Sequence, residues 1–370
     1  GRWFYLGLEL ARELGLDAAL GVELERELGL DAALGVELAV AQGLELGVEL
    51  AYSSTCPCSA ALARQLVQDN FATAFPAGKG ADREAVLAVW RGNLGQDARM
   101  SSKYDWFYDR APTGAPLLQL LMHAGTESPV GVCAAGRRRM LRNGRQTRAG
   151  VLVDLAVIPA HRTLGPALIL QQGMFSAGQR DFDLLYGFPN PKAAPVFKRI
   201  GYRHLAEMIR YVRVVRHAQY LRHRLPRSLA RLAVPLGALI DLGHRLRDAG
   251  RWPMARGLRA QWFDRAPDIA ALWDASPKPL AITALRDAAH LHWRFDDAPA
   301  DPDQPRFRHL QLFDGEGPAA WFATRVDGHT LKIHDFWSRD GAQPAPAIIA
   351  AMLREARRQG QTAVSVELAT

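Results

Sequence analysis

The clearest pattern in the chain is an apolar run at residues 151–158 that ends at a proline. Asp154 is its one polar member, so the run predicts a strand covered on both faces. Beyond Pro159 the apolar residues take helical spacing over 167–179, and a second apolar run follows at 184–189. The order strand, helix, strand, helix after an antiparallel meander indicates an α+β or α/β three-layer sheet.

The residues on either side extend this pattern into a mixed α/β (α+β) sheet flanked by helices. Residues 104–108 form an aromatic cluster that we expect at a lid or core edge. We predict strands at 117–124, 130–135 and 202–215, helices at 82–94 and 193–200, and a basic loop or strand extension at 137–150.

The end of the chain, residues 279–370, follows the same order of elements as a second, smaller half. We predict helices at 283–291 and 345–359, and strands at 307–313, 319–326, 331–336 and 362–368. The turn at 338–342 differs from its counterpart after residue 158. We therefore expect a degenerate partner of residues 76–215.

The opening segment, residues 1–52, is repetitive and acidic. Residues 13–24 recur identically as residues 27–38. Leu, Ala and Glu favour a helix, whereas the repeated glycines oppose it and the alternation imitates strands. We expect low structural definition and no chemistry here, as in a recent duplication or an artificial segment.

Charge is divided unevenly along the chain. Residues 1–52 carry a net charge of −7, which leaves +15 for the rest of a chain whose net charge is +8. A basic catalytic part favours an anionic cosubstrate, an acidic substrate or nucleic acid. The alternative explanation of the positive charge is a composition that uses Arg in place of Lys.

An arginine-rich helical connector spans 216–278, where we expect a solvated face, with membrane or nucleic-acid contact as the alternative.

Length and composition set wider limits. A chain of 370 residues is long enough for two domains. It has no apolar stretch near the ~18 residues of a membrane span and no recognisable signal peptide. Three cysteines do not form a disulfide framework. We expect a cytoplasmic, reduced setting.

The turn after residue 158 carries the strongest candidate chemistry. Arg162 and Gly165 stand between a strand and a helix, in the pattern Arg-x-x-Gly-x-Ala. Such a turn directs backbone N–H groups and the helix dipole toward one point, where phosphate binds. A plain strand–helix turn glycine is the alternative at Gly165.

With the strand at 184–189, Asn190 and the short helix that closes at Gly201-Tyr202, this turn resembles the GCN5-related N-acetyltransferase superfamily. The resemblance spans about 140 residues, and the C-terminal part resembles a truncated second copy, as in tandem acyltransferases. It implies the mixed sheet of that family and acetyl-CoA as cosubstrate, with no metal.

The resemblance also implies binding residues. Backbone groups of Leu155, Ala156 and Val157 would pair with the pantetheine arm. Asn190 would lie where the central strands part, although a turn residue before Pro191 is the alternative. The diphosphate would be held by Arg162, Thr163, Leu164, Gly165, Pro166 and Ala167.

Acyl transfer also needs groups that move protons. Many relatives use a tyrosine where this chain has Phe197. Asp154, Asn190 and Tyr202 are the catalytic candidates. Asp154 would act as a base through water, and its alternative is a buried, hydrogen-bonded carboxylate or a surface position. Direct attack by a well-placed amine is a further route.

A second resemblance lies at residues 53–75. The Cys-Pro-Cys-Ser segment that begins at Cys56 is similar to type IB GTP cyclohydrolases, in which the first cysteine binds the catalytic metal. One thiolate does not make a metal site, since catalytic Zn takes about three protein ligands. A fragment fused to an acyltransferase accounts for both resemblances, and a redox pair or helix-start cysteines are alternatives.

We therefore expect an acyl-CoA-dependent N-acyltransferase acting on a small-molecule or peptide amine, with no specific nucleic-acid partner. The alternatives are a non-catalytic, chimeric or designed protein with a decayed CoA site, and a cyclohydrolase-like metal enzyme. The acceptor and the oligomeric state are left open by the sequence.

Overall fold

The computed structural model describes residues 71–74, 81–225, 230–248, 255 and 257–369. The predictions for the acidic repeats at 1–52 and for Cys56 lie outside these residues and stay predictions. None of the helices among the described residues is both long enough and apolar enough to span a bilayer.

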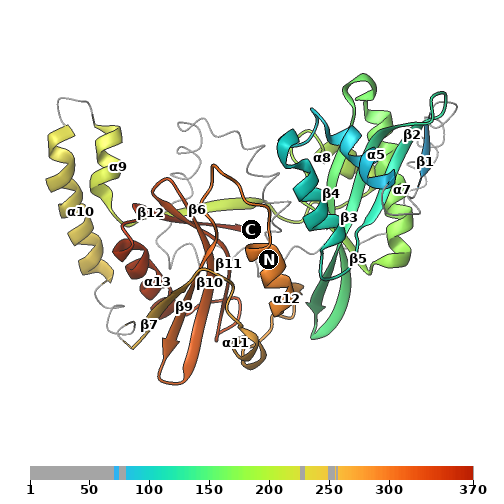
Figure 1. Ribbon diagram of the computed structural model, residues 1–370. Helices are drawn as coiled ribbons and strands as arrows, with labels where there is room; N and C mark the ends of the chain where they lie inside the picture. Colours follow the sequence, from blue (N-terminus) through green and yellow to red (C-terminus); the bar gives the residue numbers. More distant parts are fainter. Residues whose placement is uncertain (1–70, 75–80, 226–229, 249–254, 256, 370) are drawn as a thin grey trace.

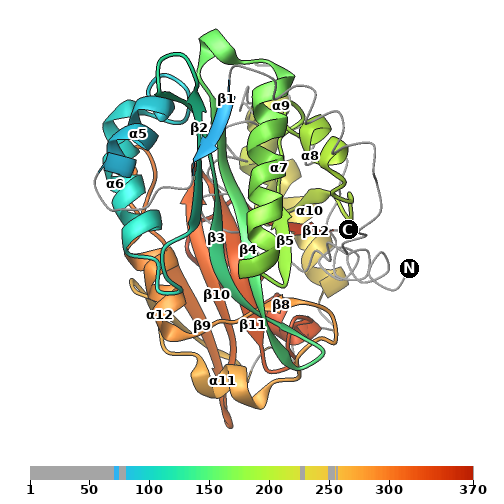
Figure 2. The same ribbon diagram turned by 90° about the vertical axis from the view of Figure 1, so that its right-hand side faces the viewer.

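The described chain forms two mixed sheets with helices on their faces (Figures 1 and 2). The first has the strand order β1-β2-β3-β4-β5, with β8 beside β3, and the second has the order β6-β12-β11-β10-β9-β7. The strands are β1 Phe71–Ala74, β2 Leu117–His123, β3 Ser128–Arg142, β4 Arg145–Val157, β5 Leu184–Gly187, β6 Met208–Val214, β7 Arg259–Phe263, β8 Thr283–Ala284, β9 Arg308–Asp314, β10 Gly317–Asp327, β11 Thr330–Ser338 and β12 Ala363–Ala369. The helices are α5 Ala81–Trp90, α6 Met100–Tyr104, α7 Leu164–Asp181, α8 Ala194–Ile200, α9 His217–Arg224, α10 Ala233–Asp248, α11 Ala270–Ala275, α12 Ala288–Leu291 and α13 Pro346–Arg358. Short 3-10 or π turns are η1 Asp97–Arg99, η2 Asp105–Asp109, η3 Pro159–His161, η4 Ala230–Leu232 and η6 His292–Asp296.

Both faces of β4 are covered, as the apolar run predicts. Val151 and Val153 belong to the core beneath α5, α6 and η2, whereas Leu152 belongs to the core beneath α7 and α8. The side chains alternate because successive residues of a strand point to opposite faces. The first sheet is therefore the middle of three layers (Figure 2).

The second sheet repeats this plan. Trp321 and Trp337 pack in a core with α11 and η6, and Phe322 and Phe336 pack on the other face with α13. In both sheets an antiparallel meander leads into one parallel pair, β4–β5 in the first and β11–β12 in the second. The two sheets therefore share one order of elements, and the division into two related halves stays a prediction.

Two strands cross between the halves. β6, at the end of the first predicted part, pairs antiparallel with β12 in the second sheet. β8 pairs with Met140 and Leu141 of β3 in the first sheet. Each sheet thus holds a strand from the other half, so a cut at residue 215 separates neither sheet cleanly.

Most predicted elements are found within a few residues of their expected bounds, and the helix expected at 283–291 is the main error. Residues 283–284 form strand β8, and α12 spans only Ala288–Leu291, where the Asp287 side chain accepts a hydrogen bond from the His290 amide. Pairing with β3 overrides local helix propensity there. The connector expected at 216–278 also includes β7 and α11, which belong to the second sheet and its helical layer.

Candidate functional site

The parting of β4 and β5 is the central feature of the candidate site. The two strands pair in parallel only from Ala149–Leu184 to Leu152–Gly187. β4 continues to Val157, so its last residues have an edge that β5 has left. β5 is the edge strand of this sheet, and the opening beyond the carboxyl end of a parallel pair is a common ligand position in α/β sheets.

A β-bulge lies just beyond the last β4–β5 pair. The register with β3 shifts between the pairs Ala134–Val153 and Val132–Ala156. Asp154 lies in this bulge with φ of 55°, in the left-handed region that non-glycine residues rarely adopt. This residue is the interruption seen in the apolar run, and the interruption marks a change in strand direction at the opening.

The carboxylate of Asp154 is held by two side chains that sequence reasoning did not identify. Lys103 Nζ lies 2.6 Å from Oδ1, and Tyr108 Oη donates to Oδ2 at 2.9 Å. The carboxylate is almost buried, and Lys103 also lies over the Trp90 ring. Burial, followed by the Asp154 charge, raises the pKa of Tyr108 well above its usual value. The aromatic run at 104–108 was the available signal for these partners.

The helix α7 begins at Leu164, so Gly165 lies in its first turn. An added Cβ at Gly165 would meet no atom within 4 Å, and Arg162, Thr163 and Leu164 are exposed. The N-cap residue Thr163 makes no side-chain hydrogen bond to the helix. The first turn of α7 therefore faces open space with its N-terminal dipole end uncovered.

The six predicted diphosphate residues differ in what they can offer. The Thr163 N–H donates to the His161 carbonyl at 2.8 Å, and Pro166 has no N–H. The amides left for an anion are those of Leu164 and Gly165, because the Ala167 N–H lies in the fourth position of α7 and donates to the helix itself. Arg162 is exposed, but its guanidinium donates to the Val157 carbonyl and the Asn93 side chain.

The three predicted backbone residues on β4 also differ. Ala156 is in register with Val132 of β3. The carbonyl of Val157 accepts from Asn93 Nδ2 at 3.0 Å. The N–H of Val157 and the backbone of Leu155, beside the bulge, remain for a ligand along the open edge.

Asn190 lies in a hydrogen-bonded turn, and Tyr202 lies in the packed interior. Asn190 Oδ1 accepts from the amides of Lys192 and Ala193 at 3.1 and 2.8 Å, so it forms the turn before α8. The Tyr202 hydroxyl is buried without a hydrogen-bond partner, and its ring packs on Phe197. Burial raises the pKa of Tyr202. The roles predicted for both residues therefore stay predictions.

The corresponding turn in the second half is closed. Gly341 has φ of +79°, and a Cβ there would lie 2.4 Å from the Pro277 carbonyl oxygen. The Asp340 carboxylate accepts from the Ala345 amide at the start of α13. A side chain of the protein thus stands where an anion would bind.

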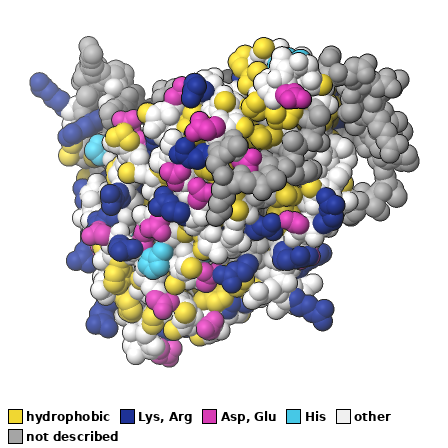
Figure 3. Space-filling model, turned by 45° about the vertical axis from the view of Figure 1, so that its right-hand side comes forward, with side chains coloured by type: hydrophobic (Ala, Val, Ile, Leu, Met, Phe, Trp, Pro, Cys, Tyr) yellow, Lys and Arg dark blue, Asp and Glu magenta, His cyan; other side chains and the backbone are white. Residues whose placement is uncertain are grey.

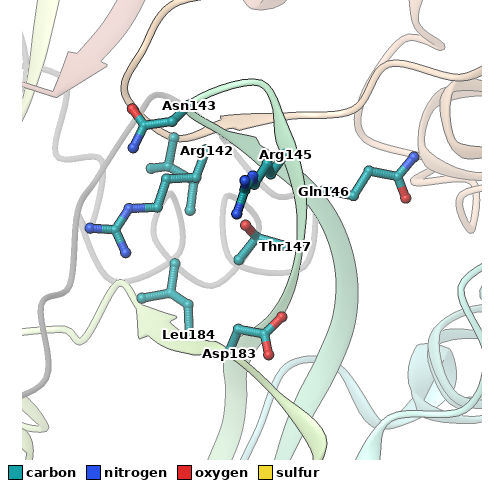
Figure 4. A pocket seen from close by; sticks show the side chains of 8 residues that line it. Arg142, Asn143, Arg145, Gln146, Thr147, Asp183 and Leu184 are labelled. Atoms are coloured by element: carbon teal, nitrogen blue, oxygen red, sulfur yellow. The ribbon is translucent and has the colours of Figure 1, made fainter.

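A separate surface cleft of about 440 Å³ lies at the opposite end of β4 (Figure 4). With a rise of about 3.3 Å per residue, Arg145 and Val157 are roughly 40 Å apart along the strand, so the cleft is remote from the α7 turn. Its lining residues are Arg142, Asn143, Arg145, Gln146, Thr147, Asp183, Leu184 and Ile282.

Basic residues on the face shown in Figure 3 are interspersed with acidic ones. Several arginines of the described chain form ion pairs, including Arg148 with Asp183 and Arg339 with Asp314. Among the residues that the structure describes there is no group of three or more His, Cys, Asp or Glu side chains placed to hold a metal ion.

Comparison with known proteins gives two separate similarities. No family model matches the chain. A short N-terminal stretch is 56% identical over 50 residues to GTP cyclohydrolase FolE2 of Pseudomonas putida, which is 14% of this chain and 16% of that protein. A 42-residue stretch is 57% identical to FolE2 of Pseudoalteromonas translucida, or 11% of this chain and 14% of that protein.

The similar solved structures match most of the chain. A GCN5-related N-acetyltransferase from Anabaena variabilis has a TM-score of 0.53 at 10% identity, over 81% of this chain and 66% of that one. One from Kribbella flavida has a TM-score of 0.50 at 12% identity, over 82% and 65%. The chain therefore spans about two thirds of these structures' length and about a sixth of FolE2. It has the GCN5-related N-acetyltransferase fold, joined to a short stretch that is similar to FolE2.

Proposed function

We propose that this chain is an acyl-CoA-dependent N-acyltransferase that binds acyl-CoA along the open edge of β4. The observation that carries the proposal is the parting of β4 and β5 after Leu152 and Gly187, next to an uncovered α7 N-terminus. An extended arm can pair with the strand edge, while its diphosphate reaches the helix.

The first turn of α7 would bind the diphosphate. The amides of Leu164 and Gly165 and the helix dipole favour a negative charge there. Arg162 adds a positive charge one residue before the N-cap. The glycine matters because a larger side chain would occupy the space that the structure leaves open at residue 165.

The reaction needs orientation and two proton transfers. The acceptor nitrogen attacks the thioester carbonyl carbon, the carbon–sulfur bond breaks, the nitrogen loses a proton and the thiolate gains one. Both oxygens of Asp154 are already engaged by Lys103 and Tyr108. In the proposal this pair holds the bulge, and orientation of the amine against the thioester supplies much of the acceleration.

The turn at Asp340 and Gly341 in the second half supports acyl-CoA binding by the first half alone. The Asp340 carboxylate already accepts from the Ala345 amide before α13, and its negative charge disfavours a diphosphate there. We assign acyl-CoA binding to the first half alone, with a stoichiometry of one per chain.

Isothermal titration of the full chain with acetyl-CoA tests the proposal. We expect one site per chain, and release of free thiol when amines from a panel of amino sugars, amino acids, peptides and polyamines are added. An absence of binding overturns the proposal. Binding without transfer to any amine supports the non-catalytic alternative.

The similarity to FolE2 favours one further candidate, a cyclohydrolase-like metal site at Cys56. It predicts stoichiometric Zn or Mn that is lost in Cys56→Ala. The acyltransferase proposal predicts that Cys56→Ala leaves the affinity for acetyl-CoA unchanged. Metal analysis and titration of the same variant separate the two.

A further inference from the structure

The hairpin of α9 and α10 carries an unusual set of exposed apolar side chains. Large apolar residues that are exposed occur at eight described positions, and five of these lie between residues 232 and 242. Leu239 is the most open of the five, at 65% exposure. Such a concentration on one surface element marks an interaction site.

The inner face of α10 is built from small residues. Ala233 is fully buried, and a Cβ on Gly237 would lie 2.4 Å from the backbone of Ala218 in α9. The acidic Asp241 is also on the inner side, where it pairs with His217 at 2.6 Å and with Arg357 of α13 at 3.3 Å. Close backbone approach thus fixes which side of α10 faces α9.

The leucines lie on the other side. Leu236, Leu239 and Leu242 are spaced by three residues, so they share one side of the helix, roughly opposite to Gly237. Their exposed fractions are 42%, 65% and 50%. A water-exposed helix normally has the reverse arrangement, with large apolar residues inside. The hairpin also lies at the outer edge of the molecule, away from the first sheet (Figure 1).

The charge of this segment indicates what the leucines contact. Residues 217–251 contain seven arginines and two aspartates. Arg222 and Arg231 are exposed, and Asp241 is paired internally. An exposed apolar stripe within a cationic segment is typical of helices that lie in the interface of an anionic membrane.

We infer that the α9–α10 hairpin docks on an anionic phospholipid surface, with Leu236, Leu239 and Leu242 in the headgroup–acyl boundary. Docking of two such faces would bring like charges together, which disfavours a second copy as the occupant. Nucleic acid would match the arginines but leave the leucines in water. The inference is independent of the acyltransferase proposal.

Vesicle flotation with the full chain tests this inference. We expect binding to phosphatidylglycerol vesicles at least tenfold stronger than to phosphatidylcholine vesicles, and weaker binding as salt is raised. Replacing Leu236, Leu239 and Leu242 by Ser should weaken binding roughly a hundredfold, because the buried apolar area is lost. The matched control is Leu280→Ser, which changes a leucine of 79% exposure outside the hairpin and should have no effect.

The triple variant should stay folded with a modest drop in unfolding temperature, because the three leucines are 42–65% exposed and serine is a weaker helix former. Wild-type failure to bind phosphatidylglycerol overturns the inference. So does a folded triple variant that binds as the wild type does. A dimer that the triple variant loses, without vesicle binding by the parent, would assign the face to a second copy and also overturn it.

Discussion

Trp106 and Trp293 exchange hydrogen bonds across the junction of the two halves. Trp106 Nε1 donates to the Trp293 carbonyl at 2.7 Å, and Trp293 Nε1 donates to the Trp106 carbonyl at 2.9 Å. Their rings stack with centroids 4.6 Å apart and planes 14° apart. Each tryptophan sits in the π-turn that follows a short helix, η2 in the first half and η6 in the second.

A reciprocal contact between equivalent residues is what a two-fold axis produces. The neighbouring sequences agree, since Trp-Phe-Tyr-Asp at 106–109 corresponds to Trp-Arg-Phe-Asp at 293–296. The junction also has contacts without such symmetry, such as Arg99 with Asp301 at 2.9 Å. The tryptophan pair therefore marks a local pseudo-two-fold relation between the halves.

Replacing either tryptophan by alanine should destabilise the whole chain. Both side chains are buried, and loss of a large aromatic group costs about 3–5 kcal/mol in free energy of unfolding. Because each ring supports the other, the double variant should cost less than the sum of the two. Urea unfolding of the two single variants and the double variant gives this coupling. Additive losses would show that the pair does not act as a unit.

Gly165→Val should abolish acetyl-CoA binding without harming the fold. The space at residue 165 is open, so the new side chain meets only a ligand. We expect at least a hundredfold loss of affinity, about 2.7 kcal/mol. Gly341→Ala is the converse control, with a lower free energy of unfolding and unchanged affinity, because its Cβ would meet Pro277 at positive φ. Unchanged affinity in Gly165→Val would refute the diphosphate site.

Asp154→Asn and Lys103→Met should each lower the affinity for acetyl-CoA, by roughly tenfold, because each removes an anchor of the strained bulge. Titration and initial rates at saturating acetyl-CoA measure binding and turnover separately. The contrary outcome is that Asp154→Asn lowers kcat but leaves the affinity for acetyl-CoA unchanged, while Lys103→Met leaves the rate unchanged. That result would identify Asp154 as the base predicted from sequence.

Stability should fall as the pH drops below about 6.5, the usual histidine pKa. Burial, together with Arg138 beside His290 and Arg325 near His334, lowers both pKa values well below that figure. As the pH falls, protons therefore bind these histidines in the unfolded chain before they bind them in the folded one. Each histidine then lowers the free energy of unfolding by up to about 1.4 kcal/mol per pH unit. Urea unfolding between about pH 7 and pH 5 should show a smaller slope in His290→Gln and His334→Gln. The exposed His329→Gln is the control, and an equal slope in all variants would contradict this assignment.

The sequence alone determined the fold class, because apolar periodicity is a local property that the packed layers then satisfy. Strand β4, helix α7 and the turn at Gly165 follow from residues that are adjacent in the chain. Asp154 was also recognisable, since one polar residue interrupts an otherwise apolar strand. Periodicity could not show its partners Lys103 and Tyr108, which lie about 50 residues earlier.

Only the tertiary structure decided where strands β6 and β8 pair, because edge pairing depends on which sheet is nearby rather than on the strand's own residues. It also decided that Gly165 faces open space while Gly341 is packed against Pro277. Two glycines of equal intrinsic freedom thus differ through distant neighbours. The reciprocal contact of Trp106 and Trp293 has the same origin, since stacking requires two halves folded against each other.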